Sequence, residues 1–121
     1  MSTLNEKKVR KLLSERRGLL EELSGLPLLM HGSYFERYST CSRPHCSCHE
    51  GKRHGPRAYV AQQHGGGSPR QHYVPKGQVE AVREGIGQYH RMLEIAYRIT
   101  AINLELMRGG RLAEQDTQEG M

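Results

Sequence analysis

The sequence predicts an α+β fold, in which long N-terminal and C-terminal helices, packed as a hairpin or coiled coil, flank a small three-stranded antiparallel sheet with a zinc-bound loop. Apolar residues recur at helical spacing at both ends of the chain, and short β-favouring runs separated by turn residues occupy the middle. All three cysteines lie together between two of these runs. We expect one domain over residues 1–108 and a disordered tail at 109–121.

The first helix is predicted over residues 4–24. Thr3 and Glu6 have the spacing of a capping box, in which each side chain binds a backbone amide that the helix leaves unpaired. Apolar residues then recur at helical spacing: Val9, Leu12, Leu13, Leu19, Leu20 and Leu23. Gly25 and Pro27 are expected to end the helix.

The middle of the chain, residues 33–75, is predicted to hold the zinc loop and the sheet. The aromatic run at 33–40 is the first expected strand, and residues 57–63 and 71–74 are the other two. The glycine-rich segment 64–69 between them is typical of a turn. The cysteines therefore fall in an irregular loop between the first two strands, and Pro75 ends the third.

The second helix is predicted over residues 76–107 and carries two apolar stripes. The first stripe is Val79, Val82, Ile86, Tyr89, Leu93, Ala96, Thr100, Asn103 and Met107, and the second is Ile95, Ile99, Ile102 and Leu106. We expect the first helix to cover one stripe and a second copy of the chain to cover the other, giving a homodimer through the helices. The alternative is a monomer in which the connector 26–30 covers the extra face. Gly85 and Gly87 indicate either a close helix approach or a bend.

The positive charge is concentrated in the middle of the chain. Of the formal net charge of +5, the stretch 37–79 holds seven cations and one anion, while the remainder is near neutral. This suggests a polyanion partner, most simply DNA rather than RNA, although charge alone does not separate it from a solvated basic surface. The expected phosphate contacts are Arg43, Lys52, Arg53, Arg57, Arg70 and Lys76, and Gln63 and Gln71 are expected to reach base edges.

The cysteine cluster has the composition of a structural zinc site. Cys41, Cys46 and Cys48 supply three thiolates, and His54 is the expected fourth ligand because it ends the loop and can turn back onto the metal. His45 and His49 are the alternative ligands, and iron is the alternative metal. Two other interpretations compete: surface thiols in a flexible loop, and redox chemistry between Cys46 and Cys48. Metal binding is favoured because the loop has few apolar residues to order it.

Membrane and secreted classes are excluded by composition. No apolar run approaches the roughly 20 residues that span a bilayer, and no signal-peptide core is present. Three cysteines do not make a disulfide framework. The expected location is the cytoplasm.

Three segments carry a resemblance to a known family: residues 31–38, the cysteine string 41–48 followed by His-Gly-Pro at 54–56, and residues 73–83 into the long helix. The chain resembles a family of small prokaryotic proteins of uncharacterised function that are often associated with transposases or mobile elements. The resemblance implies metal ligands at Cys41, Cys46, Cys48 and His54. Arg57 departs from it, since an aromatic residue is expected after Gly-Pro. The architecture is also similar to the arm-binding domains of tyrosine integrases, which lay a sheet into the DNA major groove.

The expected function is that of a zinc-stabilised, DNA-binding accessory or regulatory factor of a mobile element. The alternative is a helical dimer that serves as a protein-interaction module for a transposase or another partner, using the second stripe and the aromatic residues Tyr34, Phe35 and Tyr38. An enzyme is not expected. The glycine run at 65–67 lacks the lysine of a phosphate-binding loop, and the one aspartate, Asp116, lies in the expected tail.

Overall fold

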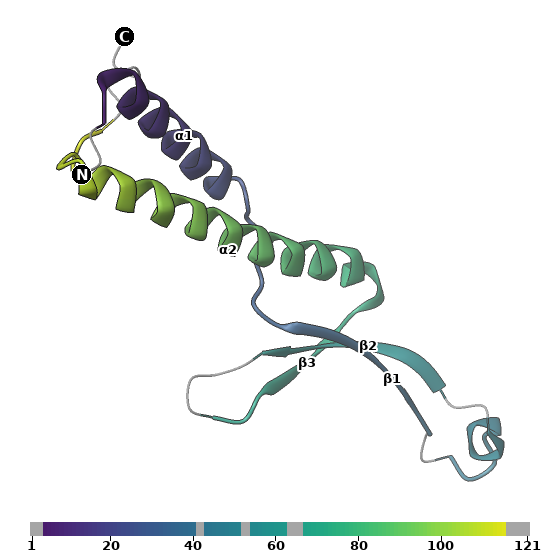
Figure 1. Ribbon diagram of the computed structural model, residues 1–121. Helices are drawn as coiled ribbons and strands as arrows, with labels where there is room; N and C mark the ends of the chain where they lie inside the picture. Colours follow the sequence, from purple (N-terminus) through teal and green to yellow (C-terminus); the bar gives the residue numbers. More distant parts are fainter. Residues whose placement is uncertain (1–3, 41–42, 52–53, 63–66, 116–121) are drawn as a thin grey trace. The chain divides into compact units, whose positions relative to one another are not determined.

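The computed structural model describes residues 4–40, 43–51, 54–62 and 67–115. Within them the fold is α+β, as predicted, with two α-helices and one three-stranded antiparallel sheet (Figure 1). The helices are α1 (Glu6–Ser24) and α2 (Val79–Arg108), and the strands are β1 (Ser33–Ser39), β2 (His54–Gln62) and β3 (Arg70–Val74). Among the described residues, neither α1 nor α2 has an apolar stretch of the length that spanning a membrane requires.

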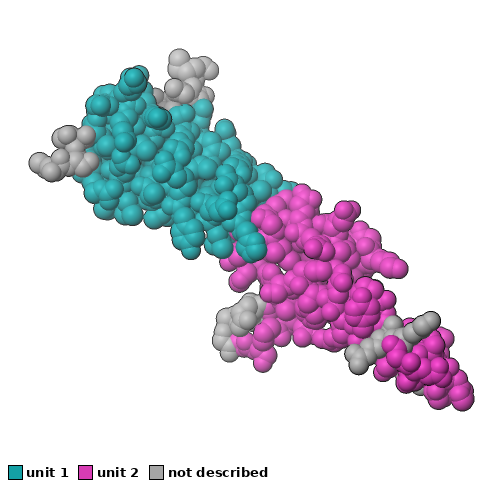
Figure 2. Space-filling model, turned by 45° about the vertical axis from the view of Figure 1, so that its right-hand side comes forward, with its two compact units in different colours: residues 1–27, 90–121 teal, residues 28–89 magenta. Residues whose placement is uncertain are grey.

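The chain divides into two compact units (Figure 2). Unit 1 contains residues 1–27 and 90–121, and unit 2 contains residues 28–89. Each unit has its own buried apolar cluster. The helix α2 contributes its first part to unit 2 and its C-terminal part to unit 1. A single folding domain over residues 1–108 stays a prediction.

The helix α1 begins at Glu6, two residues later than predicted, and ends at Ser24 as predicted. Its N-cap is Asn5, whose side-chain Oδ1 accepts a hydrogen bond from the Lys8 amide at 2.7 Å. A short amide side chain on extended backbone reaches the amide three residues on, which makes asparagine a good cap. The predicted capping box depended on Thr3, which lies outside the described residues. The cap that the structure describes is Asn5.

The core of unit 1 joins α1 to the C-terminal part of α2 through the second predicted stripe. Ile102 and Leu106 are fully buried and share one cluster with three residues of α1: Val9, Leu12 and Leu13. Burying one such side chain contributes about 1.5–3 kcal/mol. The sequence predicted the stripe and that α1 covers one of the two stripes, but not which of them.

Two salt bridges between α1 and α2 flank this core. Arg98 donates two hydrogen bonds to the Glu15 carboxylate, at 2.6 and 2.7 Å. Arg91 does the same to Glu22, at 2.6 and 2.8 Å. In each pair the guanidinium hydrogen bonds hold the pKa of the glutamate below its ordinary value. These carboxylates are exposed, so the pairs orient the helices more than they stabilise them.

Residues 109–115, the described part of the predicted tail, contact α1. Arg111 pairs with Glu6 at 3.0 Å and also with Glu114. Arg16 of α1 donates to the Glu114 carbonyl oxygen at 2.5 Å. These contacts hold residues 109–115 against α1, and residues 116–121 lie outside the described part.

The sheet of unit 2 has the order β1-β2-β3, and both pairings are antiparallel. The first strand starts at the predicted residue, whereas β2 begins three residues earlier than predicted, at His54. The His-Gly-Pro string at 54–56 therefore belongs to the strand and not to the loop before it. Its first residue pairs with Ser39 across an irregular register.

One side of the sheet, here called the inner face, packs against the first turns of α2. Its buried residues are Ala58, Val60 and Val74, and the helix contributes Val79, Val82 and Ile86. The first predicted stripe is thus covered by the sheet at its N-terminal end, which the sequence did not indicate. A 3-10 turn at Lys76–Gln78 precedes α2, so the α-helix starts at Val79 and not at Lys76.

Gly85 marks a close approach, although not to another helix. A Cβ atom at this position would overlap the Leu28 carbonyl oxygen. The Met30 amide also donates to the Gly85 carbonyl oxygen at 3.0 Å. The approaching segment is the connector before β1. At Gly87, by contrast, a Cβ atom would meet nothing within 4 Å.

Candidate functional site

The loop between β1 and β2 carries the four predicted metal ligands. Cys46 Sγ lies 3.1 Å from His54 Nε2, so two of the four are in contact. Cys41 and the side chain of Cys48 lie outside the described residues. Among the side chains that are described, no three or more possible ligands come together. The four-ligand set stays a prediction.

The contact between Cys46 and His54 has dimensions close to those of a metal site. In a tetrahedral zinc site, bonds of about 2.3 Å to sulfur and about 2.0 Å to nitrogen place these two atoms about 3.5 Å apart. An increase of about 0.4 Å in the distance between Cys46 Sγ and His54 Nε2 would therefore make room for the ion. His45, His49 and His54 are all exposed, and His54 is the one whose ring is described in contact with the Cys46 sulfur.

Gly55, the residue after His54, permits the backbone conformation that β2 adopts at this point. Gly55 has a φ of +134°, which side chains of L-residues rarely adopt. A Cβ atom there would lie 2.9 Å from the Arg37 carbonyl oxygen and 3.1 Å from the Tyr38 ring. β2 therefore passes β1 closely at the point where its first residue turns toward the cysteine loop.

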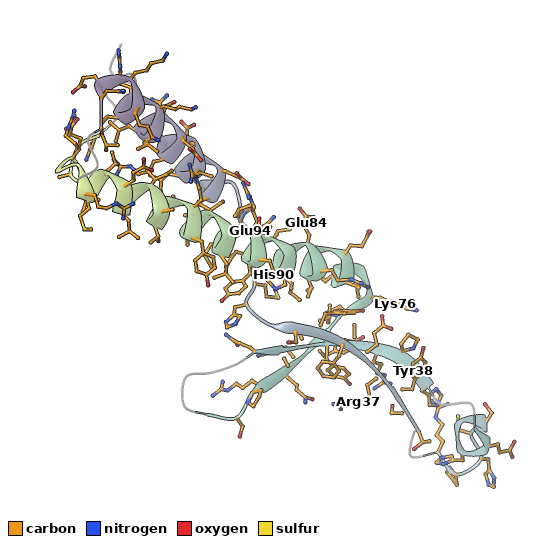
Figure 3. The ribbon with its side chains drawn as sticks, viewed as in Figure 1. Arg37, Tyr38, Lys76, Glu84, His90 and Glu94 are labelled. Carbon is orange, nitrogen blue, oxygen red and sulfur yellow. The ribbon has the colours of Figure 1, made fainter. Side chains whose placement is uncertain are left out.

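The second part of the site is the outer face of the sheet, the side opposite to the inner face. Side chains alternate along a strand, so this face carries the residues between the buried ones: Phe35 and Arg37 from β1, Arg57 and Tyr59 from β2, and Gln71 and Tyr73 from β3. Within the described part of unit 2, α2 lies on the inner side only (Figure 1). Figure 3 shows Arg37 on the side of the sheet turned away from α2.

Three aromatic rings form a row across the outer face. Phe35, Tyr59 and Tyr73 occupy paired positions on the three strands. The first two rings are stacked with centroids 5.5 Å apart, and the second pair meets edge to face at 5.9 Å. Tyr73 is 58% exposed. We call these three residues the aromatic row.

Two arginines lie opposite each other beside the aromatic row. Arg37 of β1 pairs in register with Arg57 of β2. Like charges directly opposite on adjacent strands are unfavourable. The Arg37 guanidinium lies 4.9 Å from the centre of the Tyr59 ring and donates to Gln71 Oε1 at 2.9 Å. The face is thus cationic and polar around an aromatic centre.

A comparison with family models places this chain. The model described as Domain of unknown function (DUF6788) matches residues 9–84, well over half of the chain. The chain belongs to the DUF6788 family. No curated protein and no solved structure matches it. The match covers the whole sheet and all four predicted ligands of this DUF6788 protein.

The predicted nucleic-acid contacts of this DUF6788 chain fall in several places. Arg57 and Gln71 lie on the outer face, whereas Arg70 pairs with Gln62 at positions that alternate to the inner side. Arg43 is exposed in the loop, and Lys76 is exposed in the 3-10 turn before α2. Lys52, Arg53 and Gln63 lie outside the described residues.

Sequence analysis missed the residues that make the outer face distinctive. Arg37, Phe35, Tyr59 and Tyr73 were not among the predicted contacts, although they alternate with inner-face residues along three strands. Pairing the strands in register would have brought them together. The aromatic residues proposed for protein interaction do not share a face. Tyr34 packs on the inner side, where its hydroxyl donates to Glu36 at 2.7 Å, and this bond raises its pKa.

Proposed function

We infer that the chain binds nucleic acid through the outer face of its sheet and the neighbouring basic loop, as an accessory or regulatory factor and not as an enzyme. One observation carries this inference: Arg37 and Arg57 lie opposite each other on a sheet face that no described helix covers. An anion bound by both guanidinium groups would offset the like charges at these paired positions. A polyanion would do so while also meeting the cations of the loop. The association with mobile elements belongs to the same proposal and comes from the family resemblance.

A structural zinc ion is proposed to hold the basic loop beside the sheet. Cys41, Cys46, Cys48 and His54 would complete a closed tetrahedral set, and the contact between Cys46 and His54 supports it. The loop also carries Arg43, Lys52 and Arg53. Because the ion would link the loop to the first residue of β2, it would keep these cations next to Arg57. The metal has no catalytic role in this proposal.

Salt dependence gives the expected size of the electrostatic contribution. Arg37, Arg57 and the three loop cations would neutralise about five phosphates. A fourfold rise in salt should then lower the affinity by about 100- to 500-fold. A ligand held mainly by apolar contacts would show little change.

Charge reversal tests the proposal. The double variant R37E/R57E should bind a labelled oligonucleotide at least about tenfold more weakly in fluorescence anisotropy. The matched control is K7E/R10E, which makes the same charge change on exposed positions of α1. Equal weakening by both variants would mean that net charge, and not the outer face, determines binding. No weakening by R37E/R57E would dispose of the proposed site.

A second copy of the chain is proposed to cover an exposed stripe on the C-terminal part of α2. Tyr97, Leu104 and Met107 are largely exposed, and with Leu93 and Thr100 they alternate steps of three and four as in a coiled-coil seam. Antiparallel pairing centred near Ala101 would place Glu94 beside Arg108 of the second copy, so the charges are complementary. The seam differs from the predicted first stripe, because Asn103 accepts a hydrogen bond from Arg16 at 2.6 Å on the α1 side.

Sedimentation equilibrium tests this pairing. The wild type should be a dimer, and L104E should be a monomer, because a charge would lie in the seam. The control L20E changes an equally exposed leucine of α1 and should remain dimeric. A monomeric wild type, or dissociation by both variants, would remove the seam from the account.

A further inference from the structure

The aromatic row is unusual because it lies on a sheet face that does not contribute to the buried core. The inner face already buries Ala58, Val60 and Val74 against α2, and an antiparallel sheet can leave its other side to water. A solvated face typically carries polar side chains, yet here each strand contributes an aromatic residue at the same level. Exposed aromatic surface of this kind marks a binding site more often than a structural one.

The outer face already accommodates a flat, charged group. The Arg37 guanidinium lies 4.9 Å from the Tyr59 ring centre and 5.6 Å from that of Phe35. Guanidinium planes and aromatic rings are the two kinds of protein surface on which nucleic-acid bases stack. Tyr73, at the edge of the row, is more than half exposed and offers its ring directly.

The two arginines lie where a phosphate backbone would pass. In register, Arg37 and Arg57 are two residues along the strands from Phe35 and Tyr59, a distance of about 7 Å. Cations on one side of a row of rings are complementary to a strand whose phosphates run beside its bases. Gln71, on the other side of the row, adds an amide that can pair with a base edge.

Aromatic rings such as those of the aromatic row bind unpaired bases better than paired ones. In a duplex the faces of the bases are covered by their neighbours, and only their edges are open in the grooves. Phenyl and phenol rings contribute little to reading edges, but they stack on bases that are splayed out of a helix. The aromatic row is therefore better suited to a single strand than to the major groove.

We propose that the aromatic row of Phe35, Tyr59 and Tyr73 stacks unpaired bases, so that the ligand of the outer face is single-stranded nucleic acid. This inference rests on the proposed function and names its substrate class. Arg37 and Arg57 hold the phosphates, and Arg37 moves from its place over the Tyr59 ring to do so. Stacking is tolerant of sequence because every base has a flat face.

Binding of four labelled probes by the full-length protein tests the inference: the strand dT12, the RNA strand U12, the duplex dT12·dA12, and a 12-residue abasic strand with the same phosphates. The wild type should bind dT12 or U12 at least about tenfold more tightly than the duplex and the abasic strand. The two single strands separate DNA from RNA as the source of the bases. Preference for the duplex, or equal affinity for the abasic strand, would overturn the inference.

Variants at Tyr73 supply the second readout. Y73A should weaken binding of the preferred single strand by about 5- to 150-fold, the value of one stacked base, and leave the abasic strand unaffected. Y73F keeps the ring and should bind as the wild type does. The control L20A truncates a leucine of α1 that is 49% exposed and should change neither affinity. Unchanged dT12 and U12 binding by Y73A would contradict stacking.

The two proposals fail in different ways. If all probes bind equally and only R37E/R57E weakens them, the cationic face stands and the aromatic row has no role in binding. If no probe binds, both proposals are wrong. Circular dichroism of Y73A should match the wild type, because the ring is exposed and outside both buried clusters.

Discussion

The two glycines of α2, Gly85 and Gly87, offer a matched test of the close contact between α2 and the connector before β1. Alanine is more favourable than glycine within a helix by about 0.8–1 kcal/mol. At Gly87, where a new Cβ atom meets nothing, G87A should therefore stabilise the protein by up to about 1 kcal/mol. At Gly85 the same gain is opposed by overlap with the Leu28 carbonyl oxygen.

The cost at Gly85 can be worked from its neighbours. Forcing a methyl group against backbone costs about 1–3 kcal/mol. Separation of the connector would also weaken the hydrogen bond from the Met30 amide to the Gly85 carbonyl oxygen, which is worth about 0.5–1.5 kcal/mol. After the helical gain, G85A should be less stable than the wild type by about 1–3 kcal/mol.

Urea unfolding followed by tyrosine fluorescence measures this difference. The chain has no tryptophan, and five of its six tyrosines lie in residues 28–89, so the signal reports mainly on unit 2. The midpoints should rank G87A above wild type and wild type above G85A. If G85A were as stable as G87A, the close approach of the connector would be refuted.

Three further predictions follow from the same contacts. Elemental analysis should find about one zinc per chain, and C46A should lose it, whereas C46A with full zinc content would exclude this thiol as a ligand. I102A, at a fully buried position, should lower the free energy of unfolding by about 2–5 kcal/mol, while the exposed control L20A should change it little. Because the pKa values of Glu15 and Glu22 are lowered in the folded state, their contribution is present above the unfolded value near 4.3 and is lost as pH falls through the folded values. The melting temperature should therefore fall slightly more on acidification in the wild type than in E15Q/E22Q, and an equal fall would contradict the pairing.

The fold class could be predicted because its signals are local. Helical spacing of apolar residues located both helices and predicted two stripes on the second, whereas the structure shows that α1 covers the second stripe. The ends of the helices were predicted less accurately. Asn5 is the N-cap of α1, and a 3-10 turn after Pro75 precedes α2, so the α-helix starts at Val79. These choices depend on backbone geometry more than on periodicity.

The outer face could not be predicted because it depends on strand register. Phe35, Tyr59 and Tyr73 are far apart in sequence, and each alone is compatible with a core residue. Only the pairing of β1 with β2 and of β2 with β3 places them in one row beside Arg37 and Arg57. The packing of the sheet against the first stripe was missed for a different reason. The spacing of apolar residues on a helix does not indicate whether a helix or a strand packs against them.

Photocrosslinking of a 5-bromouracil strand, with the attached peptide identified by mass spectrometry, tests the binding face most directly. Crosslinks should fall on Tyr59 or Tyr73, whose rings would lie against the bases. Crosslinks confined to α1 or to the C-terminal part of α2 would contradict the account.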